Sequence, residues 1–267
     1  MSASTTPSPA AYLPGTGTIA RFALIEALRG RLALAVVAVA LLGLGIAVFL
    51  GEMAIMEAAR IEASALAAFN RLAAALLVVS FVISGITREQ ADKGLELLLS
   101  LAIPRASYVM GKLLGYMVLA WLTAIVFCAP LLLFAPVQNV AAWGLSLALE
   151  LSLVVAAALA CALVIGQSAL SLLTVAAFYT LSRVMATILA ITASPVGPID
   201  SPGFRVMGWV MGAIAALLPG LDRFASAAWL WESGAVWAHM PALLIQFVIY
   251  LPLLASIALF DFYRRNL

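Results

Sequence analysis

Long apolar runs separated by short polar segments dominate this chain. Six runs reach the roughly 18 to 20 residues that cross a hydrocarbon core about 30 Å thick. They lie at residues 32–50, 66–86, 109–134, 143–165, 168–189 and 243–260. Because 66% of the residues are apolar and only 10% are charged, no soluble domain is expected beside them. The pattern predicts an all-α membrane protein with six transmembrane helices, all in one domain over residues 18–267.

The N-terminal 17 residues have a different composition from the rest. They are rich in Ser, Thr, Pro and Gly and contain no basic residue, which is typical of a disordered tail and not of a secretory signal. Residues 18–31 then place Phe22, Ile25 and Leu28 at helical spacing, with Arg21 near the other side. This segment is either an amphipathic helix on the inner leaflet or an ordinary basic flank of the first span.

The distribution of basic residues predicts the orientation of the chain. With the N-terminus inside, nine Lys or Arg residues fall on the cytoplasmic side and four on the outer side. The positive-inside rule favours this arrangement, so both termini are expected in the cytoplasm of a cell whose inner (plasma) membrane holds the protein. The nine are Arg21, Arg29, Arg31, Arg88, Lys93, Arg105, Lys112, Arg264 and Arg265, and the four are Arg60, Arg71, Arg205 and Arg223.

Two further charges lie inside spans. Glu150 precedes Gln167 by 17 residues and Arg183 follows it by 16. A turn of about three residues around Gln167 makes the fourth and fifth spans antiparallel neighbours, so both charges lie about 25 Å from the inner turn. Since a lone charge at this depth costs roughly 2 to 3 kcal/mol, Glu150 and Arg183 are expected to form an ion pair or to share a polar pocket that contacts a transported group.

The polar segment between the second and third spans has its own helical pattern. Thr87 and Gln90 stand at capping-box spacing, and Pro104 ends the segment. Charged residues cover the remaining faces, so a helix lying at the membrane surface is expected. The apolar stripe consists of Leu95, Leu98, Leu99 and Ala102.

Residues 192–240, between the fifth and sixth spans, contain two apolar runs too short to cross a bilayer. They cover residues 206–218 and 225–231 and are predicted to be outer half-helices, either interfacial or re-entrant. Four tryptophans in this region are typical of an aromatic belt.

The residues that catalysis or metal binding requires are sparse. The chain has no G-x-x-x-x-G-K-[ST] phosphate loop, one histidine and two cysteines that fall within apolar spans. No catalytic, cofactor or metal site is therefore expected on this chain, and its net charge of +2 follows from the cytoplasmic bias and gives no reason to expect nucleic acid as a partner.

Residues 87–115 resemble the permease subunits of ABC-2 type (type-2 ABC) exporters. That family carries a motif of the form E-x-x-x-G-T-L-E-L-L-L-S-x-P-I-S-R followed by L-x-G-K-x-x-G. Here Lys93 and Gly94 stand where the family has Gly and Thr, and Pro104 follows Ile103 instead of preceding it. Residues 217–230 are similar to the outer loop of the branch that contains the permease for nitrous-oxide reductase copper maturation. The matching positions are Glu89, Leu95, Glu96, Leu97, Leu98, Leu99, Ser100, Ile103, Arg105, Gly111, Lys112 and Gly115.

The resemblance implies a transport function in a larger complex. Residues 87–100 would form a coupling helix in a cleft of a separate ABC ATP-binding subunit, present in two copies that hold the ATP and Mg, and two permease copies would form a homodimer in the lipid bilayer. The transport path would lie between the copies, lined by the second and fifth spans. A membrane scaffold or assembly factor without transport activity is the alternative. The residues expected to contact the ATPase are Arg88, Glu89, Asp92, Gly94, Leu95, Glu96, Leu98 and Leu99.

Overall fold

The structure is a computed structural model that describes residues 13–53, 57–92, 104–193, 202–231 and 236–264. Helices make up most of this part of the chain, which contains no strand. Six helices are long and apolar enough to cross a membrane, so the prediction of an all-helical membrane-spanning protein is confirmed. They are α2 (Arg31–Glu52), α3 (Ala58–Ala91), α5 (Arg105–Leu131), α6 (Val137–Ile165), α7 (Ser168–Ala193) and α9 (Met240–Arg264).

The first helix, α1 (Leu13–Arg29), begins five residues earlier than expected. Residues 13–17, assigned to the disordered tail from the sequence, therefore belong to the helix, and residues 1–12 lie outside the described part. Proline is compatible with the first helical turn, because the amide hydrogen it lacks has no partner there anyway. At the other end, the extended backbone of Gly30 separates α1 from α2.

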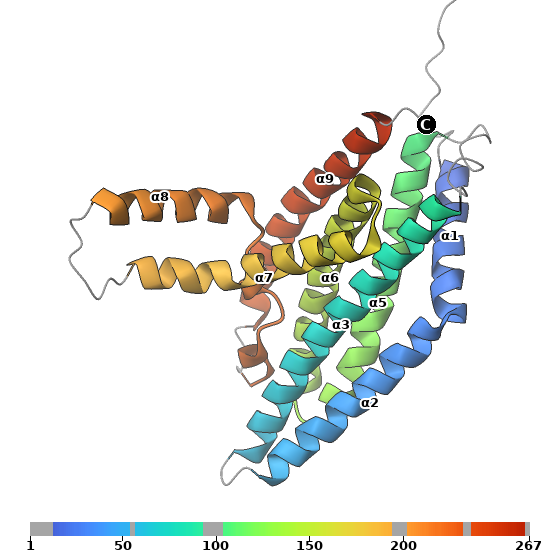
Figure 1. Cartoon of the computed structure of the whole chain (residues 1–267). Coiled ribbons are helices and arrows are strands. Elements are labelled where there is room, and N and C mark those ends of the chain that lie inside the picture. Colours follow the sequence, from blue (N-terminus) through green and yellow to red (C-terminus); the bar gives the residue numbers. More distant parts are fainter. Residues whose placement is uncertain (1–12, 54–56, 93–103, 194–201, 232–235, 265–267) are drawn as a thin grey trace, which may run out of the picture.

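Helix α6 is the centre of the bundle. In its most apolar window 83% of the residues are buried, against 11% for the last span. It contacts α3, α5, α7 and α9, and Figure 1 shows it among these helices. The alanines between residues 156 and 162 have small side chains, so neighbouring helices can approach α6 closely. Close packing matters here because lipid provides little hydrophobic driving force for helix association.

The turn between α6 and α7 is as short as the sequence predicts. Gly166 ends α6 with a φ of 69°, in the left-handed region that favours glycine, and α7 begins at Ser168. Helix α7 stays in contact with α6 from Ser171, whose hydroxyl donates to Cys161 O at 3.3 Å, to Arg183. Beyond this point α7 and α8 (Pro202–Leu217) lie side by side and project away from the other helices (Figure 1).

The region before the last span is only partly as predicted. The first apolar run lies in helix α8, but the second contains only a short 3-10 turn, η3 (Ala227–Leu230), instead of a half-helix. Another 3-10 turn, η2 (Leu221–Arg223), lies between the two runs. The α8 segment and the following turns are bent by 65° relative to each other. Side chains and backbone groups of the bundle bind this segment, as described below, and these tertiary contacts replace the helical hydrogen bonds that a regular helix would make.

Candidate functional site

A partly buried ionic cluster joins the end of α3 to the beginning of α5. Glu89 lies in the last turn of α3, and its carboxylate accepts a hydrogen bond of 2.6 Å from the Tyr108 hydroxyl. The ammonium group of Lys112, which is 5% exposed, forms an ion pair with the same carboxylate. Tyr108 and Lys112 are one turn apart on α5 and face α3 together. The cluster therefore clamps the end of α3 to the beginning of α5.

The described residues of the predicted ATPase contact point in two directions. The side chains of Arg88 and Asp92 are 81% and 71% exposed, with 3.9 Å between Arg88 Nε and Asp92 Oδ2. Glu89 instead faces the bundle, because its carboxylate is bound to Tyr108 and Lys112. The other five predicted contact residues lie outside the described part of the chain: Gly94, Leu95, Glu96, Leu98 and Leu99.

Thr87 does not cap a new helix, because α3 continues to Ala91. Its hydroxyl donates to Ile83 O at 2.8 Å and lies 2.7 Å from the hydroxyl of Ser168, the first residue of α7. A Cβ atom on Gly166 would lie 3.2 Å from the Gln90 side-chain oxygen, so the α6–α7 turn packs directly against the end of α3. This end of α3 therefore contacts α7 as well as α5.

Two glycines of α5 form a seat for α1. A Cβ atom at Gly111 would come within 2.8 Å of Ile19 Cβ, and one at Gly115 within 2.7 Å of Ala20 O. Their four-residue spacing places both on one face of α5, which is the small-residue arrangement that lets membrane helices approach closely. Lys112 lies between them and faces Glu89, so the G-K-x-x-G run serves two contacts at once.

A second buried cluster lies near the middle of α6 and contains both charges singled out from the sequence. Arg183 Nη1 lies 2.8 Å from Glu150 Oε1, and the Tyr179 hydroxyl donates to the same oxygen at 2.9 Å. Glu150 is 1% exposed. Arg71 of α3 belongs to the same electrostatic neighbourhood, since its charge interacts with both Glu150 and Arg183. The structure thus brings together three elements, α3, α6 and α7, around one carboxylate.

The same cluster holds the irregular segment after α8. Arg183 donates to Leu221 O at 2.8 Å and to Phe224 O at 3.4 Å, and Arg71 donates to Ala225 O at 2.8 Å. Trp143 of α6 donates to that carbonyl too, at 3.1 Å. Ala225 has a φ of 45°, an uncommon value for a residue with a side chain, and these bonds hold it there.

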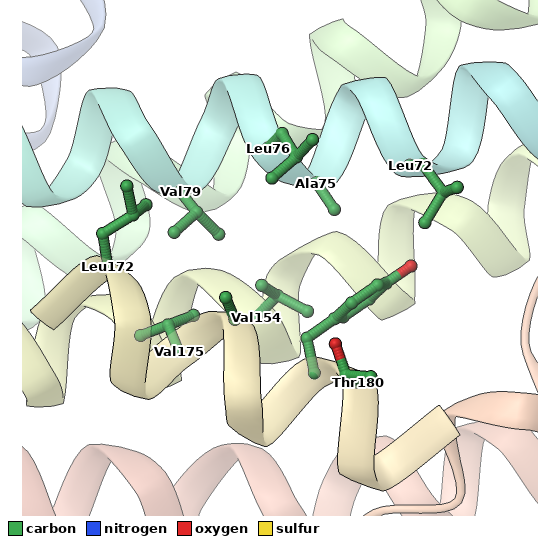
Figure 2. Close-up of a pocket in the computed structure, with 10 residues that line it drawn as sticks. Leu72, Ala75, Leu76, Val79, Val154, Leu172, Val175 and Thr180 are labelled. Carbon is green, nitrogen blue, oxygen red and sulfur yellow. The ribbon is translucent and has the colours of Figure 1, made fainter. Parts of the chain in front are cut away.

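An apolar groove of about 180 Å³ runs between α3 and α7 (Figure 2). Leu172 of α7 lies opposite Val79 of α3 at one end of the groove, and Leu72 of α3 lies toward Thr180 of α7 at the other end. Val154 of α6 also lines the groove. The groove also reaches Tyr179, which contacts the Glu150 cluster, and Thr180. It can therefore hold an apolar group beside a buried polar cluster.

Comparison with known proteins adds no family assignment: no family model matches the chain, and no curated protein matches it.

Reasoning from the sequence missed Arg71 and Tyr179. The position of Arg71 along the membrane normal follows from counting residues. Arg71 precedes Thr87 by 16 residues, and Arg183 follows Ser168 by 15. Since Thr87 and Ser168 are in contact, both arginines lie at the same depth. Tyr179 stands one turn before Arg183, on the same face of α7, which is the only signal for it in the sequence.

Proposed function

We propose that this chain is the transmembrane subunit of an ATP-driven exporter of the ABC-2 type, working with separate ATP-binding subunits. The observation that carries the proposal is the ion pair between Glu89 and Lys112, two residues of the run that resembles the family motif. They are 23 positions apart and meet at the two ends of residues 93–103. The residues that flank the expected docking segment in the sequence therefore form a partly buried ion pair, called the base below.

The contacts around this base provide a route for mechanical coupling. A force applied at the end of α3 would act on α5 through the Glu89 cluster, and through α5 on α1 at the Gly111 and Gly115 seat. It would also act on α7 through the contact between Thr87 and Ser168. Rigid-body movement of packed elements is one of the established forms of conformational switching, and these contacts are suited to it.

The groove between α3 and α7 is the proposed path for cargo, completed by a second copy of the chain. It is lined by the two helices that the family resemblance assigns to the path. Only 17% of the most apolar window of α7 is buried within one copy, so most of this helix is available to a partner copy or to lipid. The apolar lining favours a cargo with an apolar part.

The proposed orientation has both termini in the cytoplasm of the plasma membrane. Six crossings return the chain to the side on which it starts. Arg105 at the beginning of α5 donates to Phe262 O near the end of α9, at 3.5 Å, so the end of the last span lies beside the beginning of α5. The segment from α8 to η3 then lies toward the outer side.

The proposal is tested by purifying the tagged chain from its native membranes in mild detergent and measuring the intact mass and the ATPase activity of the complex. The expected result is two permease copies with two ATP-binding chains. Glu96→Arg should release the ATP-binding chains and abolish the associated ATPase activity without lowering the thermal stability of the permease. Glu57→Gln, at an exposed carboxylate just before α3, is the matched control and should leave the complex intact.

A stable wild-type complex without any nucleotide-binding chain would contradict the proposal. The same result would support the alternative function, a membrane scaffold or assembly factor, because a scaffold requires no ATPase.

A further inference from the structure

A second pocket lies on the side of α7 that faces α8 and α9. Its volume is about 170 Å³, and it is bordered by the second half of α7, the end of α8, η2 and α9. Its lining differs from the apolar groove because polar side chains from three elements reach it. These are Ser182 of α7, Asp222 and Arg223 of η2, and Gln246 and Tyr250 of α9.

Two oxygens in this pocket lack hydrogen-bond partners within the described part of the chain. They are the hydroxyl oxygen of Ser182, a residue that is 0% exposed, and Oε1 of Gln246. Buried polar atoms are almost always paired, and leaving one unpaired costs free energy. Tyr250 does not serve them, because its hydroxyl donates to the backbone at Leu218 O, 3.0 Å away. Two residues that line the pocket, Ser182 and Gln246, therefore each carry a buried oxygen without a hydrogen-bond donor among the described residues.

Charge in the pocket is separated instead of paired. Asp222 and Arg223 both line it, yet no ion pair joins them, and within the described residues Asp222 makes no ion pair with any other side chain. The carboxylate of Asp222 adds a third acceptor site to those of Ser182 and Gln246. A primary ammonium has three donors and no acceptor, which matches these three groups. The guanidinium of Arg223 suits a phosphate or carboxylate at the other end of the same ligand.

The space for such a ligand depends on Gly220. A Cβ atom at this position would lie 3.1 Å from Gln246 Nε2 and 3.3 Å from Asp222 Oδ1, so even one methyl group would crowd both side chains. The pocket volume equals roughly six water molecules at about 30 Å³ each, which exceeds the need of a bare metal ion and fits a small head group.

We propose that this pocket binds a zwitterion in which a primary ammonium is joined by a short spacer to a phosphate or carboxylate. The ammonium lies among Asp222, Gln246 and Ser182, and the anionic group lies against Arg223. Phosphatidylethanolamine and soluble compounds such as phosphoethanolamine or an amino acid share this chemistry. The proposal does not depend on the transporter function, because it concerns binding by the chain itself.

The test is native mass spectrometry of the delipidated full-length protein in mild detergent, titrated with phosphatidylethanolamine, phosphatidylcholine, phosphatidylglycerol or free phosphoethanolamine. N-methylation removes the ammonium donors of phosphatidylcholine, so we expect the ethanolamine compound to bind roughly tenfold more tightly. Asp222→Asn should remove most of this preference, and Glu57→Gln should leave it unchanged. Binding of free phosphoethanolamine without the lipid would assign the pocket to a soluble ligand.

A second pair of variants distinguishes loss of ligand binding from misfolding of the protein. Ser182→Ala removes an acceptor that has no hydrogen-bond partner among the described residues, so it should weaken ammonium binding severalfold while the thermal stability stays at the wild-type value or rises. Gly220→Val should block binding by filling the pocket. Equal binding of the ethanolamine and choline lipids together with no binding of free phosphoethanolamine, or unchanged ethanolamine binding in Asp222→Asn, would overturn the proposal and leave the pocket to water.

Discussion

Removing Arg183 should destabilise the protein far more than removing an exposed arginine. Arg183→Leu eliminates the 2.8 Å contact with Glu150 and the 2.8 Å hydrogen bond to Leu221 O. The carboxylate stays behind at 1% exposure, with the Tyr179 hydroxyl as its hydrogen-bond donor and the charge of Arg71 nearby but not in ion-pair contact. Breaking a buried ion pair in this way costs about 3 to 5 kcal/mol. That corresponds to a fall of roughly 10 °C in the apparent Tm.

The assay is thermal unfolding of the purified protein in mild detergent, followed by size-exclusion chromatography. The control is Arg60→Leu, which makes the same chemical change in an ion pair whose side chains are 57% and 64% exposed. Exposed pairs contribute under about 1 kcal/mol, so the control should unfold close to the wild-type temperature.

A double-mutant cycle with Glu150→Leu tests the physical reasoning directly. Once the carboxylate is absent, Arg183→Leu no longer leaves a buried charge unpaired, so the two effects should fall short of additivity by at least about 1 kcal/mol. Effects that add within about 0.5 kcal/mol would refute the view that these two groups stabilise each other.

Three further changes test the region where the end of α3 meets α5 and the α6–α7 turn, and where α1 packs on α5. Lys112→Met should lower stability by about 3 kcal/mol because it leaves Glu89 charged without its cation, and Glu89→Gln in the same chain should recover part of the loss in the same thermal assay. Gly115→Leu should push α1 away from α5 and make α1 sensitive to limited proteolysis, whereas Gly45→Leu should not, since nothing lies within 4 Å of a Cβ at that position. Gly166→Ala should cost about 1 kcal/mol in thermal unfolding, because its φ of 69° is unfavourable for alanine.

Features that depend on local sequence were predictable. The six spans follow from apolar run length, because a chain in lipid must satisfy its backbone hydrogen bonds within helices. The equal depth of Glu150 and Arg183 could be predicted because the turn around Gly166 is too short to shift one helix along the other. Once two antiparallel helices share a short turn, residue counting gives the depth of each side chain.

Other features depend on how helix faces are turned in the assembled bundle. Glu89 was expected to face an ATPase, but α3 continues past it and directs it toward Lys112. The run 225–231 was expected to be a half-helix, but its first carbonyl, Ala225 O, accepts hydrogen bonds from Trp143 and Arg71, and residues 227–230 form only a short 3-10 turn. Periodicity identifies the sides of a helix and does not say which neighbour each side meets.

The lengths of the apolar runs are enough to predict a helical bundle that spans a membrane, because backbone groups in lipid must form their hydrogen bonds within helices. The folded arrangement was needed to learn which cations surround Glu150, how α1 packs on α5, and which polar residues line the pocket between α7 and α9. These arrangements arise from the rotation and crossing of packed helices, which depend on many small contacts spread over the whole chain.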